Sequence, residues 1–266
     1  MPRRRPTDPT GSAAGYFSPA PPRIIAHRGL AIDAPENTML AFARALALGV
    51  THLETDVHAS ADGVAMVSHD PDLVRMVGRN VRIEQLTSHE LRRIPLGHGQ
   101  GFVSLAEMLD GFPEARVNID IKDPHAVDPT VVAVVSARAT QRVLIGSFSG
   151  RRRQAAVQRL PGVATSLSAA AAVPAVLAAR SGAIPALRRI LTGVDAVQLP
   201  TRVARLDPFT PRALAAFHEV GVEVHAWTIN DPDEMTRLLD LGVDGLITDR
   251  SDVALSLLRS RSGGRA

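Results

Sequence analysis

The sequence predicts a single α/β domain, a TIM (β/α)8 barrel, and two observations support that fold class. Short segments rich in Val, Ile and Leu alternate with longer segments of helical periodicity along most of the 266 residues. Gly-Val pairs precede several of the apolar segments, where glycine can end a helix and valine can begin a strand. This alternation is typical of a parallel sheet, and eight repeats favour a closed barrel. An open doubly wound sheet is the alternative.

Eight segments are expected to form the strands. Most are short apolar runs, because strands of a parallel barrel are covered on both faces. The expected strands are residues 23–27, 52–57, 116–121, 143–147, 163–167, 196–199, 223–228 and 245–248.

Helices are expected in the intervals between these strands. Ser104 and Glu107 have capping-box spacing, and the pair Asp231-Pro232 provides a cap followed by a first-turn proline. The expected helices include residues 38–48, 104–109, 130–137, 151–159, 211–220, 232–241 and 251–258.

One stretch does not fit the alternation. Residues 71–103 contain many charges, glycines at positions 97, 99 and 101, and a possible short helix at 88–93. We interpret this stretch as a small insertion after the second strand, on the active face of the barrel. The barrel domain is then residues 23–259, between flexible tails at 1–22 and 260–266.

Composition restricts the location and the chemistry of the protein. The chain has no cysteine, so disulfides and thiolate metal ligands are excluded. No apolar run follows Arg3–Arg5, as a secretory signal would require, and no segment is long enough to span a membrane. Residues 169–179 come closest but are interrupted by Pro174. We therefore expect a cytoplasmic protein without a membrane span; its oligomeric state is unknown from the sequence.

The charge pattern argues against nucleic acid as a partner. The formal net charge is +3, and 29 of the 30 basic residues are arginines that are scattered along the chain. Aromatic residues, which stack on bases, make up only 3% of the sequence. A small-molecule substrate is therefore favoured.

Carboxylates gather where expected strands end. Glu54 and Asp56 are two residues apart on one strand, so their side chains point to the same side, and Asp120 lies at a similar height on the neighbouring strand. Three carboxylates this close repel one another unless a cation lies between them. Oxygen ligands without sulfur favour Mg²⁺ or Ca²⁺. The alternative is that one or two of them cap helices or pair with arginines.

Two histidines follow other strand ends. His27 ends the first strand, and His69 follows a short extended segment at 64–67. A pair of histidines beside a metal suits general acid–base catalysis, in which one removes a proton and the other supplies one. Most of the nine histidines are expected to be solvated or structural.

Four further residues are candidates for substrate binding. Arg28 could hold a phosphate oxygen through its guanidinium, although most arginines form surface ion pairs. Lys122 is the only lysine in the chain and lies two residues after Asp120, so a functional role is favoured. Glu36 could hold Arg28 or the metal site. Trp227, the only tryptophan, could line the substrate entrance or pack in the core.

Taken in order, the motifs of the chain resemble those of the glycerophosphodiester phosphodiesterases. The resemblance covers residues 23 to 258, and its specificity comes from the ordered set rather than from any one motif. The matching segments are Ala26-His27-Arg28-Gly29, Pro35-Glu36-Asn37-Thr38, Leu53-Glu54-Thr55-Asp56-Val57, His69-Asp70, Asn118-Ile119-Asp120-Ile121-Lys122, Ser147-Phe148, Trp227-Thr228-Ile229-Asn230 and Asp244-Gly245-Leu246-Ile247-Thr248-Asp249.

The resemblance implies a TIM barrel with a small insertion and a function for each candidate residue. It implies that His27 and His69 form the acid–base pair and that the products are an alcohol and glycerol 3-phosphate. Glu54, Asp56 and Asp120 would hold one divalent cation, Arg28 and Lys122 would contact the phosphate, and Glu36 would support the site.

The chain departs from the family pattern at one position. The third metal ligand of the family is usually glutamate, whereas this chain has Asp120, which is one methylene shorter. This difference affects the identity and affinity of the metal more than the reaction. Two other functions remain open: a barrel phospholipase D-like enzyme acting on lysophospholipids, and a catalytically silent binding barrel.

Overall fold

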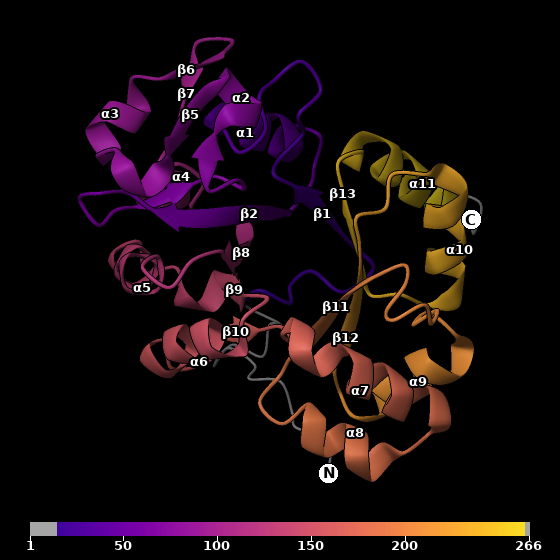
Figure 1. Cartoon of the computed structure of the whole chain (residues 1–266). Helices are drawn as coiled ribbons and strands as arrows, with labels where there is room; N and C mark the ends of the chain where they lie inside the picture. The colour runs from indigo at the N-terminus through magenta and orange to yellow at the C-terminus, as the bar shows by residue number, and fades with distance from the viewer. Residues whose placement is uncertain (1–14, 264–266) are drawn as a thin grey trace.

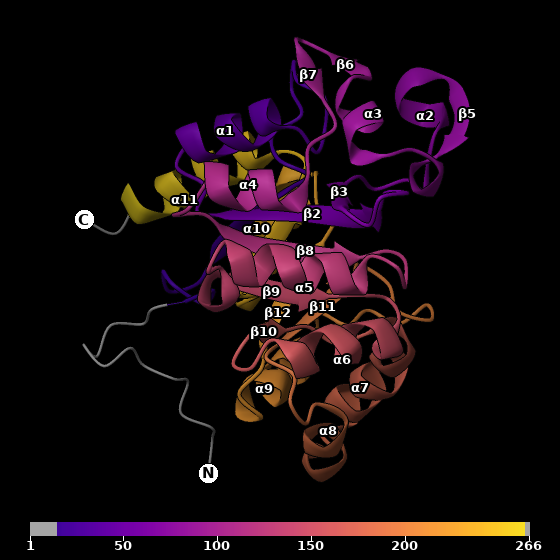
Figure 2. The ribbon, with the colours of Figure 1, turned by 90° about the vertical axis from the view of Figure 1, so that its left-hand side faces the viewer.

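The computed structural model describes residues 15–263 and shows a parallel barrel surrounded by helices (Figures 1 and 2). The sequence prediction of the fold class is confirmed. The barrel strands are β1 (Arg23–His27), β2 (His52–Ala59), β8 (Arg116–Ile121), β9 (Val143–Gly146), β10 (Ala164–Thr165), β11 (Ala196–Pro200), β12 (Glu223–Trp227) and β13 (Gly245–Thr248).

The pairing of the strands excludes an open doubly wound sheet. The order is β10-β9-β8-β2-β1-β13-β12-β11, so the first strand lies between the second and the last. The two ends of this order meet through one parallel bridge between Ser166 and Ala196. The barrel is therefore nearly closed, with its weakest joint beside the short strand β10.

Helices cover the outside of the barrel, and five of them begin at a side-chain cap. Thr38, Ser104, Ser149, Thr210 and Asp231 each accept a hydrogen bond from a backbone N–H in the first turn of the helix that follows. The helices are α1 (Met39–Ala47), α4 (Leu105–Gly111), α5 (Val127–Ser136), α6 (Gly150–Arg159), α7 (Ala169–Ser181), α8 (Ile184–Ile190), α9 (Pro211–Glu219), α10 (Pro232–Leu241) and α11 (Ser251–Gly263), with a 3-10 turn, η2 (Thr140–Arg142).

The sequence analysis did not predict α7 and α8. Alanine has the highest helix propensity, and the run of alanines from residue 169 forms a helix despite Pro174. Gly182 ends it in the left-handed conformation. Among the described residues, no helix is long and apolar enough to cross a membrane.

A small subdomain follows β2. Strand β3 (Ala65–Val67) runs antiparallel to the end of β2. The subdomain has its own cluster of buried side chains, which includes Leu73, Ile83 and Phe102. Figure 2 shows this subdomain at the end of the barrel toward which β2 points. Its other elements are β4 (Asp72–Leu73), α2 (Val74–Val77), β5 (Arg79–Arg82), η1 (Ile83–Gln85), α3 (Ser88–Arg92), β6 (Pro95–Gly97) and β7 (Gln100–Gly101).

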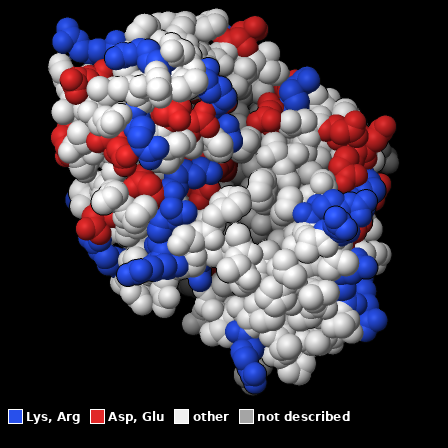
Figure 3. Space-filling view, viewed as in Figure 1, with Lys and Arg blue, Asp and Glu red and all other residues white. Residues whose placement is uncertain are grey.

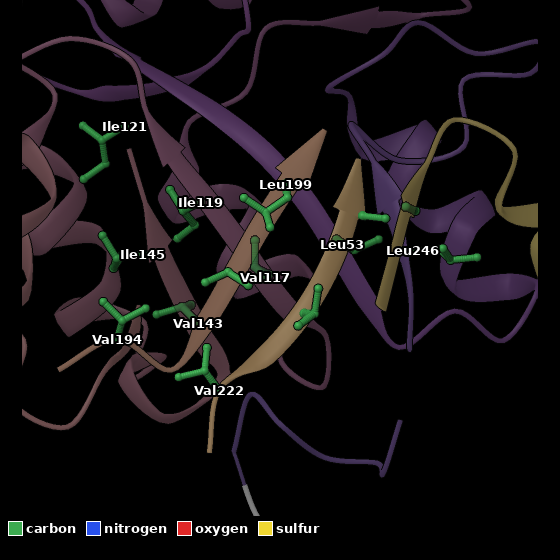
Figure 4. Packing of buried hydrophobic residues seen from close by; sticks show 14 of the residues in the cluster. Leu53, Val117, Ile119, Ile121, Val143, Ile145, Val194, Leu199, Val222 and Leu246 are labelled. Atoms are coloured by element: carbon green, nitrogen blue, oxygen red, sulfur yellow. The ribbon is translucent and has the colours of Figure 1, made fainter. Parts of the chain in front are cut away.

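Alternation along the strands separates the core from the site. On β8, the buried side chains of Val117, Ile119 and Ile121 belong to the main hydrophobic cluster, part of which is shown in Figure 4. The residues between them, Asn118 and Asp120, point to the other face, because successive side chains of a strand alternate. The barrel interior therefore receives polar side chains at its carboxyl end.

Part of the N-terminal segment differs from the tail that the sequence predicted. Residues 1–14 lie outside the described residues, but Tyr16 is 2% exposed and packs edge-on against His52 at a centroid distance of 5.1 Å. Arg23 donates a hydrogen bond of 2.6 Å to the Phe17 carbonyl. Residues 15–22 thus lie against the amino ends of the strands. At the other end, α11 continues to Gly263, so residues 260–263 are helical as well.

Candidate active site

Most of the predicted site residues surround one cavity at the carboxyl ends of the strands. Its volume is about 310 Å³. Figure 3 shows a hollow on this face, with charged groups on the side of the inserted subdomain and uncharged surface over α7. The predicted residues that line the cavity are His27, Arg28, Glu54, Asp56, His69, Asp120, Lys122 and Trp227.

Glu36 is the predicted residue that does not line the cavity. Its carboxylate accepts a hydrogen bond of 3.0 Å from Arg28 and bonds of 2.6 and 3.1 Å from Arg75 in the inserted subdomain. Glu36 therefore holds the guanidinium of Arg28 in place. A larger hollow of about 760 Å³ lies beside α5, but none of the predicted site residues line it.

The turn after β1 places His27 and Arg28 beside Glu54. His27 is in register with Glu54 on β2, and the N–H of Arg28 donates to the backbone and to the carboxylate of Glu54, at 3.0 and 3.2 Å. Arg28 has a positive φ of 56°, and Gly29 follows with a φ of 84°. This sharp turn directs both side chains to the cavity instead of continuing the strand.

Each of the two histidines has a carboxylate partner. His27 Nδ1 lies 2.7 Å from Asp249 Oδ1, and His69 Nδ1 lies 2.7 Å from Asp70 Oδ1. A carboxylate that accepts from Nδ1 orients the ring and leaves Nε2 available for proton transfer. Burial lowers the pKa of His27, but Glu54 and Asp249 outweigh it, so the pKa is raised above its usual value.

Lys122 lies between two of the three predicted metal ligands. Its Nζ is 2.8 Å from Asp56 Oδ1 and 2.7 Å from Asp120 Oδ2. Burial raises the pKa of Asp56, but the charges of Lys122 and Arg28 outweigh it and hold that pKa below the usual carboxyl value. Lys122 thus balances the charge of these carboxylates.

The third carboxylate has less compensation. Glu54 is 6% exposed, and burial together with repulsion from Asp56 raises its pKa well above the usual carboxyl range. His27 Nε2 is 3.9 Å from Glu54 Oε2. The surroundings of Glu54 therefore favour one more positive charge.

The carboxylates fit a divalent cation by their chemistry but are not arranged as a complete ligand set. Within residues 15–263, no group of three or more His, Asp or Glu side chains is positioned to hold a metal ion. The donors would be oxygen atoms, which suit hard cations, and the shortage of positive charge at Glu54 is consistent with one. Asp56 and Asp120 would have to exchange Lys122 for the ion.

Several neighbours of the site carried no assigned function in the sequence analysis. Asp249 holds His27 and accepts a hydrogen bond of 2.7 Å from Asn230 Nδ2. Asn37 donates to Asp56 at 3.3 Å. Phe148 is 54% exposed and packs edge-on against Trp227 at the cavity wall. The sequence feature that could have identified Asp249 is its position directly after the last strand, β13, which pairs with β1 and therefore brings Asp249 close to His27.

The fold and this site define a TIM-barrel enzyme with paired histidines above buried carboxylates. Residues 27–253 match the glycerophosphoryl diester phosphodiesterase family. The chain belongs to this family and is a phosphodiesterase.

Relatives cover nearly the whole chain. "Probable glycerophosphodiester phosphodiesterase 2" of Mycobacterium tuberculosis is 42% identical over 239 residues, which cover 89% of this chain and 90% of that protein. A glycerophosphodiester phosphodiesterase of Caldanaerobacter subterraneus is 27% identical, over 89% of this chain and 97% of that protein. A lysophospholipase D of Rattus norvegicus is 26% identical, over 85% of this chain and 83% of that protein.

Solved structures show the same fold. The glycerophosphodiester phosphodiesterase of Thermotoga maritima superimposes with a TM-score of 0.70 at 26% identity, covering 88% of this chain and 97% of that chain. A phosphodiesterase of Oleispira antarctica, in complex with its product sn-glycerol-3-phosphate, gives a TM-score of 0.72 at 22% identity, covering 90% of this chain and 97% of that chain.

Proposed function

We propose that this protein hydrolyses glycerophosphodiesters to an alcohol and glycerol 3-phosphate, with His27 and His69 as the acid–base pair. The observation that carries the proposal is the matched geometry of these histidines. Both line one cavity, and both have Nδ1 on a carboxylate at 2.7 Å. The family match and the product bound to the Oleispira enzyme support the substrate class.

The two histidines divide the proton transfers. Nε2 of His27 removes the proton from the attacking hydroxyl, which belongs to water or to C2 of the glycerol. A new P–O bond forms, the P–O bond to the alcohol breaks, and Nε2 of His69 protonates the departing oxygen. Attack by the glycerol hydroxyl would be intramolecular, which favours it entropically, and would give a cyclic phosphate. Water would then attack that phosphate and break its P–O bond to the C2 oxygen, which yields glycerol 3-phosphate.

The cations of the chain bind and orient the phosphate. Arg28 is braced by Glu36, and Lys122 is held over the cavity by Asp56 and Asp120. Both are placed to attract the non-bridging oxygens and offset the charge that grows on them in the transition state.

Glu54, Asp56 and Asp120 would hold one divalent cation, Mg²⁺ or Ca²⁺. A bound cation would act as a Lewis acid toward the phosphate oxygens. Lys122 competes for the same oxygens of Asp56 and Asp120, and release of Lys122 from them would make its ammonium available to the phosphate. Because Asp120 is one methylene shorter than glutamate, its carboxylate reaches less far, and the affinity for the cation should be measured directly.

The test is hydrolysis of glycerophosphocholine by the wild type and by His27→Ala, with EDTA and with Mg²⁺ or Ca²⁺ restored. We expect glycerol 3-phosphate to form, EDTA to abolish its release and one cation to restore it. His89→Ala, at an exposed position of α3, is the control. Activity that persists in EDTA would disprove the metal requirement, and near wild-type turnover by His27→Ala would disprove its catalytic function.

The assignment of the acid can be tested by the leaving group. His69→Ala should lose roughly 100-fold or more in kcat on glycerophosphocholine, whose alcohol leaves poorly, and much less on a nitrophenyl diester, whose phenolate needs no proton. An equal loss on both substrates would instead make His69 the base.

Hydrolysis of lysophospholipids is a second candidate, favoured by the apolar wall of the cavity. Phe148, Trp227 and Val173 of α7 line it, and Phe148 and Val173 are exposed to 54% and 37%. Such a wall could hold an acyl chain, and the lysophospholipase D relative supports this alternative. Comparison of kcat/KM for lysophosphatidylcholine and glycerophosphocholine separates the two.

A further inference from the structure

A buried histidine lies directly behind His69 and has no function in the proposed mechanism. His58, near the end of β2, is 8% exposed. Its Nε2 lies 3.1 Å from the backbone carbonyl oxygen of His69, and its Nδ1 lies 3.1 Å from Asp123 Oδ2. One ring nitrogen of His58 therefore contacts the main chain of the residue whose side chain is proposed to protonate the leaving alcohol.

Asp123 holds the ring of His58 in this orientation. It directly follows Lys122, and its two carboxylate oxygens accept further hydrogen bonds from the N–H groups of Ala59, at 3.1 Å, and Ala126, at 2.9 Å. Burial raises the pKa of Asp123, but the hydrogen bonds from His58 and these two N–H groups outweigh it and hold that pKa below the usual carboxyl value. The carboxylate thus joins the end of β2 to the loop that leads into α5.

The segment that carries His69 is open on one side, so hydrogen bonds matter more than packing for its position. The side chain of His69 is 36% exposed, and a hollow of about 340 Å³ lies beside it. The main chain just before it is held by one bond of 3.0 Å, from the N–H of Ser68 to the Asp56 carbonyl. The hollow lies between the inserted subdomain and the end of β8, and its lining includes His58, His69, Arg82, Ile83, Lys122 and Asp123.

We propose that His58 is a positioning residue for His69, and that its bond to the His69 carbonyl sets how far the His69 ring reaches toward the departing oxygen. This inference rests on the proposed function, because it requires His69 to be the acid. His58 contacts the carbonyl and not the ring of His69, so it acts on the position of the acid and takes no part in the proton transfer. A displacement of about 1 Å at a reacting group can lower a rate about 100-fold.

Two amide variants separate the two contacts of His58. The side-chain nitrogen of asparagine lies near the position of Nδ1, so His58→Asn keeps the contact with Asp123 and loses the one with His69. The side-chain nitrogen of glutamine reaches the position of Nε2, so His58→Gln keeps the contact with the His69 carbonyl.

The variants are assayed for kcat and KM on two substrates that differ only in the alcohol. One is glycerophosphocholine, and the other is the 4-nitrophenyl ester of glycerol 3-phosphate, whose phenolate leaves without a proton and does not need the acid. His52→Asn is the matched control. It removes the same kind of contact, 2.7 Å from Nε2 to the Tyr16 carbonyl, at the other end of the same strand.

We expect His58→Asn to lower kcat on glycerophosphocholine roughly tenfold or more, with little change in KM, and to lose much less on the nitrophenyl ester. His58→Gln and His52→Asn should keep most of the wild-type ratio of the two rates. Asp123→Asn, which weakens the hold on the ring and leaves His58 in place, should lower the ratio by a smaller factor. It carries the test if His58→Asn does not fold.

His69→Ala, assayed beside these variants, separates the inference from the proposed function. Equal ratios in His58→Asn and His58→Gln, or equal losses on both substrates in His58→Asn, would make His58 a structural residue and overturn the inference while the proposed function stands. If His69→Ala lost equally on both substrates, His69 would not be the acid, and the inference would fall with that assignment. Folded wild-type protein that cleaves neither substrate would overturn the proposed function itself.

Discussion

Lys122 shows how one side chain can balance a charged site. It is the only lysine among 30 basic residues, and its ammonium contacts carboxylate oxygens from two neighbouring strands at 2.8 and 2.7 Å. An ammonium is compact and can contact both, whereas a guanidinium is broad and planar. The ring of Phe148 lies 5.6 Å from the same ammonium.

Removal of this ammonium should make the stability of the protein depend on metal ions. Lys122→Met leaves Asp56, which is 2% exposed, and Asp120 without their shared cation, and breaking such a pair costs about 3 kcal/mol. Added Mg²⁺ or Ca²⁺ should therefore raise the Tm of Lys122→Met more than that of the wild type. Thermal unfolding with EDTA and with each cation is the measurement, and Arg250→Met, which breaks an exposed pair with Asp252, is the control. If the cations raised the Tm of Lys122→Met and of the wild type equally, Asp56 and Asp120 would not be their binding site.

Replacement of Asp249, the carboxylate partner of His27, should lower kcat. With Asp249→Asn, Nδ1 loses its anionic partner and the preferred ring tautomer is no longer enforced, so kcat on glycerophosphocholine should fall roughly 100-fold with little change in KM. Asp244→Asn is a matched control, because Asp244 forms a similar pair with His218 at 2.8 Å outside the cavity. Comparable losses in both variants would point to a general structural effect.

At the scale of elements, the turn between β1 and α1 brings backbone unusually close to backbone. A Cβ at Gly29 would lie 2.7 Å from the Ala41 carbonyl carbon and 2.8 Å from its Cβ, and the φ of 84° disfavours any other residue. This close contact fixes the angle at which the chain leaves His27 and Arg28, so the helix α1 contributes to the geometry of the site.

Gly29→Ala should therefore destabilise the protein more than its positive φ alone requires. A left-handed φ costs about 1 kcal/mol, and the clash with α1 should bring the total to about 3 kcal/mol or more. Gly63→Ala isolates the first contribution, because Gly63 has a φ of 73° and nothing lies within 4 Å of its added Cβ. Urea unfolding of both variants is the measurement. If Gly29→Ala and Gly63→Ala lost the same free energy of unfolding, α1 would shift to accommodate the new Cβ at little energetic cost.

The elements that the sequence predicted best are those with independent local signals. The sequence contains recognisable capping residues, such as Ser104 before α4, and strand segments that alternate with helical ones. The observed bounds of β1 are the predicted ones. The helix α7 was missed because an alanine-rich run has little amphipathic contrast, so its periodicity does not distinguish a surface helix from an apolar segment.

At the scale of the whole molecule, the two ends of the barrel have different functions. The carboxyl end carries the cavity, while the amino end is covered by residues 15–22 and a buried ion pair of 2.8 Å between Arg23 and Glu223. His52 lies within this lower layer, fully buried, with Nε2 at 2.7 Å from the Tyr16 carbonyl. Burial lowers the pKa of His52 to about 3.

The lowered pKa of His52 makes stability depend on pH. In the unfolded chain His52 binds a proton below its ordinary pKa of 6.5, whereas in the folded protein it stays neutral until about pH 3. Stability should therefore fall as pH drops from 6.5 toward 3, by up to about 1.4 kcal/mol per pH unit from this residue. His52→Gln should have a flatter profile over this range than the exposed control His89→Gln, as measured by urea unfolding at pH 4 to 7. Parallel profiles would mean that other groups account for the acid sensitivity.

The sequence by itself determined the barrel, the inserted subdomain and eight of the residues that line the cavity. It did so because strand periodicity and the ordered motifs are local properties, and parallel strands bring all their carboxyl ends to one edge. Tertiary structure alone decided the partners of those residues. The contacts of Asp249 with His27, of Glu36 with Arg75 and of Lys122 with Asp56 join positions 39 to 222 residues apart. The packing of Tyr16 against His52 likewise depends on which side chains the closed barrel brings together, and the local sequence pattern does not encode that.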